Sequence, residues 1–142
     1  MIDLGISRID KDLPLPGYAT PGSVAFDVYA REETRIAPRS LGLIPSNLIV
    51  CVPEGYVLLL ASRSSTPLKK GLLTPHGIGI VDQDFCGPSD EMRVQVYNFT
   101  DAAVVIKRGE RVAQAMVTPV EKCRLVETEM TGASRGGLGS TG

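Results

Sequence analysis

Residues able to act on a phosphorylated small molecule are gathered in four short stretches of this 142-residue sequence. The first is Arg63-Ser64-Ser65, which Thr66 separates from a proline at position 67. That proline, the lysines after it and a glycine at position 71 predict a short, N-capped helix within residues 64–71. Hydroxyl groups, free backbone N–H groups and a guanidinium at the start of a helix suit phosphate oxygens. The alternative is that these serines only cap the helix.

The second stretch is the C-terminus, residues 135–142, which combines glycines with two hydroxyl side chains and an arginine. Its backbone amides could form a concave anion site over a phosphate group. The stretch lacks the lysine of a P-loop and precedes no helix, so a P-loop is excluded. The alternative is a plain polar tail.

The third and fourth stretches carry acids. Residues 77–87 place Asp82 and Asp84 at the tip of a predicted hairpin, where a fixed carboxylate could act as a general base on water. Asp27 lies on the predicted strand 24–30, opposite the apolar face formed by positions 24, 26 and 28. Asp and Gly are also ordinary turn residues, and Asp27 could simply face solvent, so both stretches also have a purely structural interpretation.

Short apolar or alternating segments surround these stretches and are separated by turns rich in glycine and proline. Alternation with a period of two predicts half-buried strands, and short apolar runs are consistent with buried ones. About eight or nine strands at this spacing predict an all-β fold, a sandwich, barrel or jelly roll, with one short helix. The segments are residues 24–30, 41–44, 48–52, 56–60, 77–81, 93–98, 104–106 and 111–116.

Length and charge narrow the class of protein further. A chain of this length is expected to form one domain, with a β domain over residues 1–130 and a glycine-rich C-terminal arm over residues 131–142. The 15 basic and 16 acidic side chains leave a net charge of −1. That balance argues against nucleic acid and anionic membranes as partners, because both need a basic excess or a basic patch.

Cysteine and histidine usage excludes several chemistries. Three cysteines without a Cys-x-x-Cys pair make a disulfide framework unexpected and favour a reduced, cytoplasmic protein. The N-terminus is charged where a signal peptide needs an apolar stretch, and no apolar run approaches roughly 18 residues. The single histidine, His76, argues against a Cys/His zinc site, and no Gly-x-Ser-x-Gly motif accompanies it.

Five motifs, taken in order, resemble those of the trimeric dUTPases, the deoxyuridine 5'-triphosphate nucleotidohydrolases. The resemblance runs from about Thr20 to the C-terminus, in the family's order and with near-family spacing. Each motif is weak alone, and five in sequence are specific. They are AFDVYA at residues 25–30, SRSS at 62–65, GIVDQDFCG at 79–87, GERVAQ at 109–114 and RGGLGSTG at 135–142.

The resemblance implies a jelly-roll-like β-barrel or sandwich that forms a homotrimer. It implies hydrolysis of dUTP to dUMP and pyrophosphate by attack of water on the α-phosphate, with Mg²⁺ as the cofactor. Such an activity limits uracil incorporation into DNA and supplies dUMP for thymidylate synthesis. The implied partners are the dUTP substrate and the other copies of the chain.

The resemblance also implies roles for single residues. Asp82 is the base that deprotonates the attacking water, and Asp27 holds waters of the magnesium ion. Phe85 packs under the deoxyribose, and Leu138 covers the base. His76 matches a position near the uracil edge, although a plain loop histidine is equally consistent with the sequence. The residues implied to bind the substrate are Arg63, Ser64, Ser65, His76, Gly77, Gly79, Ile80, Val81, Phe85, Gln114, Arg135, Leu138, Ser140 and Thr141.

Some positions depart from the family pattern. Leu138 stands where a phenylalanine is usual, Phe85 replaces a tyrosine, and Pro88-Ser89-Asp90 forms a small insertion. These differences bear on base affinity more than on reaction type. The alternatives within the fold are a dCTP deaminase, a bifunctional deaminase-dUTPase and a non-catalytic nucleotide-sensing relative. The presence of Asp82 and Arg135 favours dUTP hydrolysis.

Overall fold

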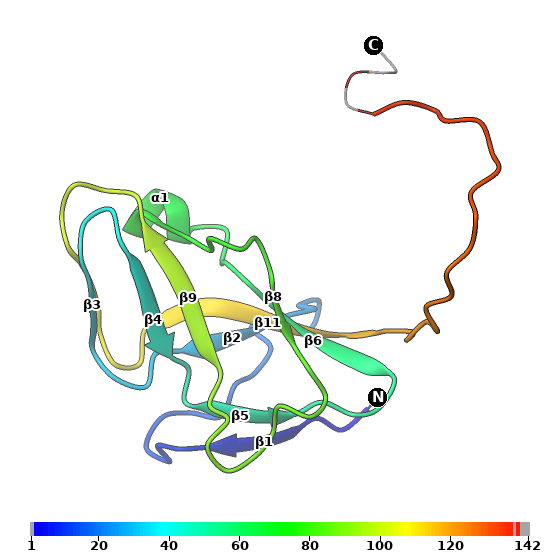
Figure 1. The fold of residues 1–142 in the computed structure, drawn as a ribbon. Coiled ribbons are helices and arrows are strands. Elements are labelled where there is room, and N and C mark those ends of the chain that lie inside the picture. Colours follow the sequence, from blue (N-terminus) through cyan, green and yellow to red (C-terminus); the bar gives the residue numbers. More distant parts are fainter. Residues whose placement is uncertain (1, 138, 140–142) are drawn as a thin grey trace.

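The computed structural model of the protein describes residues 2–137 and 139, and within them eleven short strands accompany one short helix (Figure 1). The first strands are β1 (Gly5–Arg8), β2 (Phe26–Tyr29), β3 (Thr34–Ile36), β4 (Leu41–Pro45), β5 (Leu48–Cys51) and β6 (Tyr56–Ala61). They are followed by helix α1 (Thr66–Lys70), β7 (Leu72–Leu73), β8 (Gly79–Val81), β9 (Arg93–Asn98), β10 (Val104–Ile106) and β11 (Arg111–Pro119). The expected all-β class with one short helix is confirmed.

The strands form two larger sheets and two strand pairs, all antiparallel. The four-stranded sheet has the order β2-β11-β6-β8, and the three-stranded sheet has the order β4-β9-β7. The two pairs are β1-β5 and β10-β3. Strands that follow one another along the chain, such as β8 and β9, belong to different sheets. This crossing between sheets is the connectivity of a jelly roll.

The hydrophobic core collects apolar side chains from both larger sheets. Val28 of β2, Ile44 of β4 and Leu58 of β6 have 0% exposed surface. Buried and half-buried residues alternate along β2, so Asp27 lies on the face away from the core. The sequence predicts Val24 on the buried face, but Val24 is 77% exposed because the strand begins only at Phe26.

Helix α1 ends as predicted and begins differently. Gly71 adopts the left-handed conformation with φ of +66°, and its N–H donates to the Pro67 carbonyl oxygen at 3.0 Å. Ser65, at the N-terminus, makes no side-chain capping hydrogen bond. Its backbone is already in the helical region, whereas a capping residue needs an extended backbone. The predicted serine cap is therefore wrong.

Three of the strands were not predicted. Strand β7 has two residues, β3 has three and β1 has four, with no apolar run in β1 or β3. Segments this short cannot display a period of two clearly. They become strands because distant strands pair with them, as β5 pairs with β1.

The segment after β11 has a different character from the rest of the chain. The described residues from 120 to 137 have no regular secondary structure and are exposed throughout. Figure 1 shows this segment running away from the sheets. In the part of the chain that the structure describes, no helix is long and apolar enough to cross a membrane.

Candidate active site

A pocket of about 490 Å³ follows β8, the outermost strand of the four-stranded sheet. Strand β8 pairs only with β6 within the described residues, so its other edge presents unpaired backbone donors and acceptors. The lining residues are Leu60, His76, Ile78, Gly79, Ile80, Val81, Asp82, Phe85, Met92 and Arg93. The pocket therefore combines apolar walls, open backbone groups and a carboxylate.

The carboxylate in the pocket belongs to Asp82, which directly follows β8 and is exposed. The Phe85 N–H donates to the Asp82 carbonyl oxygen at 3.3 Å, which brings the half-exposed Phe85 ring into the same pocket. The predicted hairpin is wrong, because β8 pairs with β6 whereas β9 pairs with β4 and β7. Residues 82–92 instead form a loop between two sheets, called the inter-sheet loop below.

The residues expected to read the base lie mostly along this pocket. His76, Gly79, Ile80 and Val81 line it, whereas Gly77 lies in the preceding turn with φ of +78° and does not. The Val81 side chain is buried in the core, so Val81 can offer a ligand only its backbone. Ile80 is 66% exposed and can offer its side chain.

A second cluster of polar groups surrounds Asp27. Its Oδ1 accepts a hydrogen bond from Arg63 Nε at 2.7 Å, and its Oδ2 accepts one from Arg111 Nη1 at 3.0 Å. The Asp27 side chain is 15% exposed, against 27% for Arg63 and 50% for Arg111. One half-buried carboxylate thus holds two arginines that can still reach solvent.

An irregularity in β11 brings Arg111 into this cluster, and sequence reasoning missed it. Gln114 lies opposite Asp27, and the register shifts between Arg111 and Ala113. In a regular strand, residues 111 and 114 would face opposite sides of the sheet. One extra residue in the strand reverses that relation and puts both side chains on the Asp27 face. The available signal was the pair of adjacent small apolar residues, Val112 and Ala113, both buried.

The remaining residues of the second cluster come from β11 and from the turn after β6. Gln114 Nε2 donates to the Ser62 carbonyl oxygen at 2.9 Å, which ties β11 to that turn. Ser64 is exposed and Ser65 half-buried, and neither hydroxyl has a hydrogen-bond partner among the described residues. We call Asp27, Arg63, Ser64, Ser65, Arg111 and Gln114 the arginine cluster.

A single copy of the chain does not bring the arginine cluster to Asp82. Gln114 lies opposite Ala61 of β6, whereas the β6–β8 register extends to put Asp82 level with Val57. Asp82 and Asp27 therefore lie four residues apart along the strand direction and three strand spacings apart across the sheet. Together these offsets separate the two residues by roughly 20 Å. The described residue Arg135 is exposed and belongs to the C-terminal segment, which runs away from the sheets (Figure 1). Leu138, Ser140 and Thr141 lie outside the described residues.

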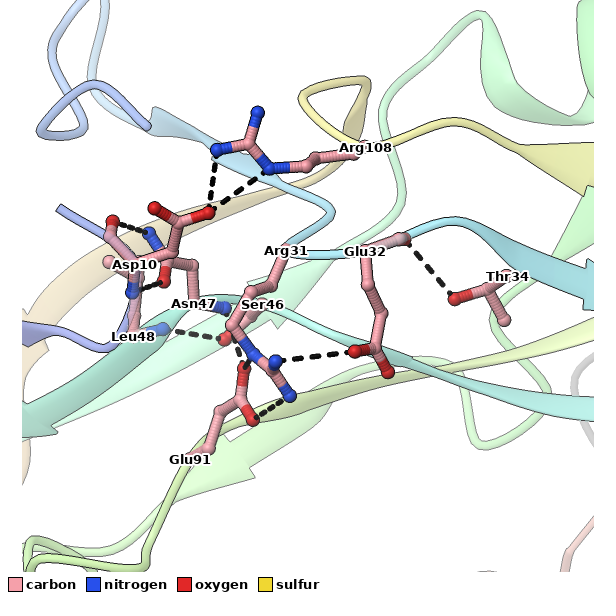
Figure 2. Close-up of polar contacts among 9 residues, drawn as sticks. All are labelled: Asp10, Arg31, Glu32, Thr34, Ser46, Asn47, Leu48, Glu91 and Arg108. Atoms are coloured by element: carbon pink, nitrogen blue, oxygen red, sulfur yellow. Dashed lines mark hydrogen bonds and ion pairs between the residues drawn. The ribbon is translucent and has the colours of Figure 1, made fainter. Parts of the chain in front are cut away.

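A partly buried ion pair holds the far end of the inter-sheet loop (Figure 2). The Glu91 carboxylate accepts hydrogen bonds from Arg31 Nε at 2.9 Å, from Arg31 Nη2 at 3.1 Å and from the Asn47 backbone N–H at 2.8 Å. Hydrogen bonding to Glu91 raises the pKa of Arg31, so this guanidinium stays charged. Met92 and Arg93, which line the pocket, follow Glu91 directly. The pair therefore fixes one wall of the pocket, which the sequence did not indicate.

Asn47 extends this contact to the N-terminal segment, as Figure 2 also shows. Asn47 Oδ1 accepts a hydrogen bond from the Asp10 backbone N–H at 2.6 Å, and Asn47 Nδ2 donates one to the Asp10 carbonyl oxygen at 2.9 Å. The Asp10 carboxylate accepts from Arg108 at 2.6 Å, and this bond holds the pKa of Asp10 below its usual value. The network locks the N-terminal segment onto the body of the protein.

The fold is that of an all-β protein, and the donors and positive charge of the arginine cluster are of the kind that suits phosphate oxygens. Comparison with known proteins identifies its family. The sequence profile of the dUTPase family matches residues 11–142, and the chain belongs to this family.

Individual relatives agree with that assignment. The deoxyuridine 5'-triphosphate nucleotidohydrolase of Dictyoglomus turgidum is 39% identical over 149 residues, covering 100% of this chain and 99% of the relative. The crystal structure of the Streptococcus mutans dUTPase matches with a TM-score of 0.78 and 31% identity, over 84% of this chain and 98% of that one. The Staphylococcus bacteriophage 80alpha dUTPase, solved with dUPNHPP, has a TM-score of 0.87 over 100% of this chain and 99% of that one. At 22% sequence identity, this match supports a similarity of fold only.

Proposed function

We propose that the protein is a dUTP diphosphatase that hydrolyses dUTP to dUMP and pyrophosphate by attack of water on the α-phosphorus. Membership of the dUTPase family and a relative of that activity matched over the whole chain support the reaction. The observation that carries the proposal is the pocket along β8, where an open strand edge lies beside an exposed carboxylate. Such an edge can hydrogen-bond a pyrimidine, and the carboxylate can take a proton from water.

In this proposal the pocket holds the nucleoside. The open edge of β8 reads uracil through backbone groups of Gly79, Ile80 and Val81, with Gly77 shaping the turn before it. His76 lies at the rim of the same pocket, and the half-exposed Phe85 ring offers an apolar surface to the deoxyribose. Asp82 then deprotonates and orients the attacking water.

The arginine cluster holds the phosphates in the same proposal. Phosphoryl transfer asks a protein mainly for positioning and for neutralisation of charge. Arg63 and Arg111 supply charge, and the unpartnered hydroxyls of Ser64 and Ser65 supply donors. Gln114 is already directed at the turn that carries these serines.

Magnesium fits this cluster only as an ion carried by the substrate. The described residues contain no group of three or more His, Cys, Asp or Glu side chains that could hold a metal. Mg²⁺ keeps several waters and needs few carboxylates when phosphates ligate it. Asp27 uses one lone pair on each oxygen for an arginine, and its remaining lone pairs can accept hydrogen bonds from metal-bound waters. Bound there, the ion would neutralise phosphate charge.

A complete site then requires a second copy of the chain. The separation of roughly 20 Å between Asp82 and Asp27 within one sheet is too long for one α-phosphate to contact both groups. Joining the pocket of one copy to the arginine cluster of another removes this conflict. We propose a homotrimer with its sites between subunits, which the family resemblance supports.

The C-terminal segment closes the site in this proposal. Arg135 would reach the γ-phosphate together with Ser140 and Thr141, and Leu138 would cover the base. The exposure of every described residue from 120 to 137 supports a segment that is available to close over substrate.

Replacement of Asp82 by asparagine tests the proposal, with the neighbouring acid Asp84 as the matched control. Asp82→Asn keeps the shape and removes the proton acceptor, so pyrophosphate release from dUTP with Mg²⁺ should lose about 10²–10⁴-fold in kcat. Binding of a non-hydrolysable dUTP analogue should stay within about tenfold. Asp84 does not line the pocket, so Asp84→Asn should keep kcat within a few-fold.

Activity of Asp82→Asn within a few-fold of wild type would remove Asp82 as the base. Release of ammonia from dCTP, without pyrophosphate from dUTP, would instead establish a deaminase. Both products are measured on the same preparations, with and without Mg²⁺.

A further inference from the structure

Two cysteines far apart in the sequence share one groove on the other side of the inter-sheet loop. Cys51 is the last residue of β5, and Cys86 directly follows Phe85. Both line a groove of about 410 Å³ that β1 and β5 form with Gly87 and Pro88 of the loop. The groove is wide enough for a small reagent to reach both sulfur atoms.

The strand beside Cys51 leaves its thiol uncovered. Gly5 of β1 lies opposite Cys51, and a Cβ at position 5 would stand only 3.2 Å from the Cys51 Cβ. Because that neighbour has no side chain, Cys51 remains exposed at the edge of the groove. Any larger residue at position 5 would press on it.

The two thiols line the same groove, and their environments differ. The hydrogen bond to the Cys51 thiol raises the pKa of Cys86, and burial and the charges of Asp84 and Asp90 act in the same direction. The Cys86 thiol also lies 3.8 Å from the Gln83 carbonyl oxygen. The proton is therefore held on Cys86, which is half-buried, and the exposed Cys51 sulfur is the better first nucleophile.

We propose that Cys51 and Cys86 form a dithiol site that a low-molecular-weight disulfide, such as oxidised glutathione, converts to an intramolecular disulfide. The Cys51 thiolate attacks one sulfur of the reagent, forming a mixed disulfide and releasing one reagent thiolate. The Cys86 thiolate then attacks the Cys51 sulfur and releases the second. The protein loses two protons and two electrons, and the reagent disulfide is reduced to two thiols.

Formation of this bond also acts on the pocket along β8, a consequence that depends on the proposed function. A disulfide requires a sulfur–sulfur distance of about 2.05 Å, shorter than any contact between two thiols. Closure therefore draws Cys86 towards β5 and displaces the adjacent Phe85, which lines the pocket. Asp82 is adjacent to the β8–β6 ladder and should move less. The oxidised protein should show a KM for dUTP raised by a few-fold, with kcat within about twofold.

Peptide mapping by mass spectrometry tests the dithiol site without any assay of activity. The full-length protein is incubated with oxidised glutathione, alkylated and digested without reductant. We expect a cross-link between the Cys51 and Cys86 peptides, and an alkylated Cys123. Closing a loop of about 35 residues should raise the Tm by roughly 10 °C at equal protein concentration, and dithiothreitol should reverse the shift.

Two variants provide the matched controls. Cys51→Ser should abolish the cross-link and the Tm shift while leaving the reduced enzyme's kinetics unchanged. Cys123→Ser should behave as wild type, because Cys123 lies outside the groove. Glutathione that stays attached to Cys51 or Cys123 without a cross-link, or a cross-link between chains, would overturn the dithiol site. A KM for dUTP that does not change on oxidation would overturn the proposed effect of the disulfide on the pocket. Absence of dUTP hydrolysis in the reduced protein would instead contradict the proposed function and leave the mapping result intact.

Discussion

Replacement of Glu91 by glutamine probes how strongly the inter-sheet loop is anchored. Figure 2 shows one arginine, Arg31, between two carboxylates. Glu91 has a side chain that is 9% exposed and makes two hydrogen bonds to the guanidinium, at 2.9 and 3.1 Å. Glu32 contacts the same guanidinium at 3.2 Å, but its side chain is 57% exposed. The two glutamates therefore form a matched pair that differs mainly in burial.

The structure gives the size of the expected effect. Removing one partner of a buried ion pair costs about 3–5 kcal/mol. Arg31 is 27% exposed and keeps Glu32, which recovers part of that cost. Glutamine also retains one acceptor, although its amide N–H groups then face the guanidinium or the Asn47 N–H. We expect Glu91→Gln to lower the free energy of unfolding by about 2 kcal/mol, or roughly 6 °C in Tm.

Urea denaturation at a fixed protein concentration measures this difference, because the proposed trimer would make stability depend on concentration. Glu32→Gln should cost less than about 0.5 kcal/mol, as solvent-exposed pairs do. Equal losses for the two variants would refute the reasoning from burial. A loss below about 0.5 kcal/mol for Glu91→Gln would show that the pair does not anchor the loop.

Two further predictions concern helix α1 and its contacts. Burial acts to raise the pKa of Glu110, but the Lys70 ammonium and the Lys107 N–H outweigh it and hold that pKa below its usual value. The stability that Glu110 contributes is then present above about pH 4.5 and is lost as the pH falls through its lowered pKa. The difference in unfolding free energy between wild type and Glu110→Gln should therefore disappear between about pH 5 and 3. Gly71→Ala should lower the free energy of unfolding by more than about 1 kcal/mol, because φ is +66° and the added Cβ would clash with Thr100 Cγ2. A thermal melt matching that of the wild type would contradict this prediction.

Local patterns were enough to predict most of the sheets. The alternation along residues 93–98 became β9, because the burial of each side chain there follows from the strand's own period. The partial alternation along residues 111–116 marked part of β11, although the extra residue in that strand breaks the period. Pairing partners could not be predicted in this way. Residues 77–87 look like a hairpin from their turn residues, yet packing in the four-stranded sheet joins β8 to β6. Which distant strand pairs with a segment is a property of the whole core.

The residues of the candidate site show the same difference between local patterns and long-range contacts. The sequence places Asp82 and Phe85 three positions apart in one turn-rich stretch, and the structure puts both in one pocket. Arg111 was not proposed as a site residue, because its approach to Asp27 depends on an extra residue in β11. The role of Glu91 could not be predicted either, because its partner Arg31 comes from a loop far away in the sequence. Contacts within one segment can be predicted from the sequence, whereas contacts that depend on register or on a distant loop cannot.

If the arginine cluster holds the phosphates as proposed, folding prepares this site before substrate arrives. Asp27 engages Arg63 through Nε, so the two terminal nitrogens of that guanidinium have no partner among the described residues and remain available to phosphate oxygens. Two guanidiniums around one carboxylate leave the cluster with a net positive charge. The side-chain entropy lost in ordering these arginines is lost during folding, so binding of a triphosphate does not have to supply it again. In the proposed site, Asp27 therefore serves the phosphates twice, by holding the arginines in place and by offering its remaining lone pairs to waters of the magnesium ion.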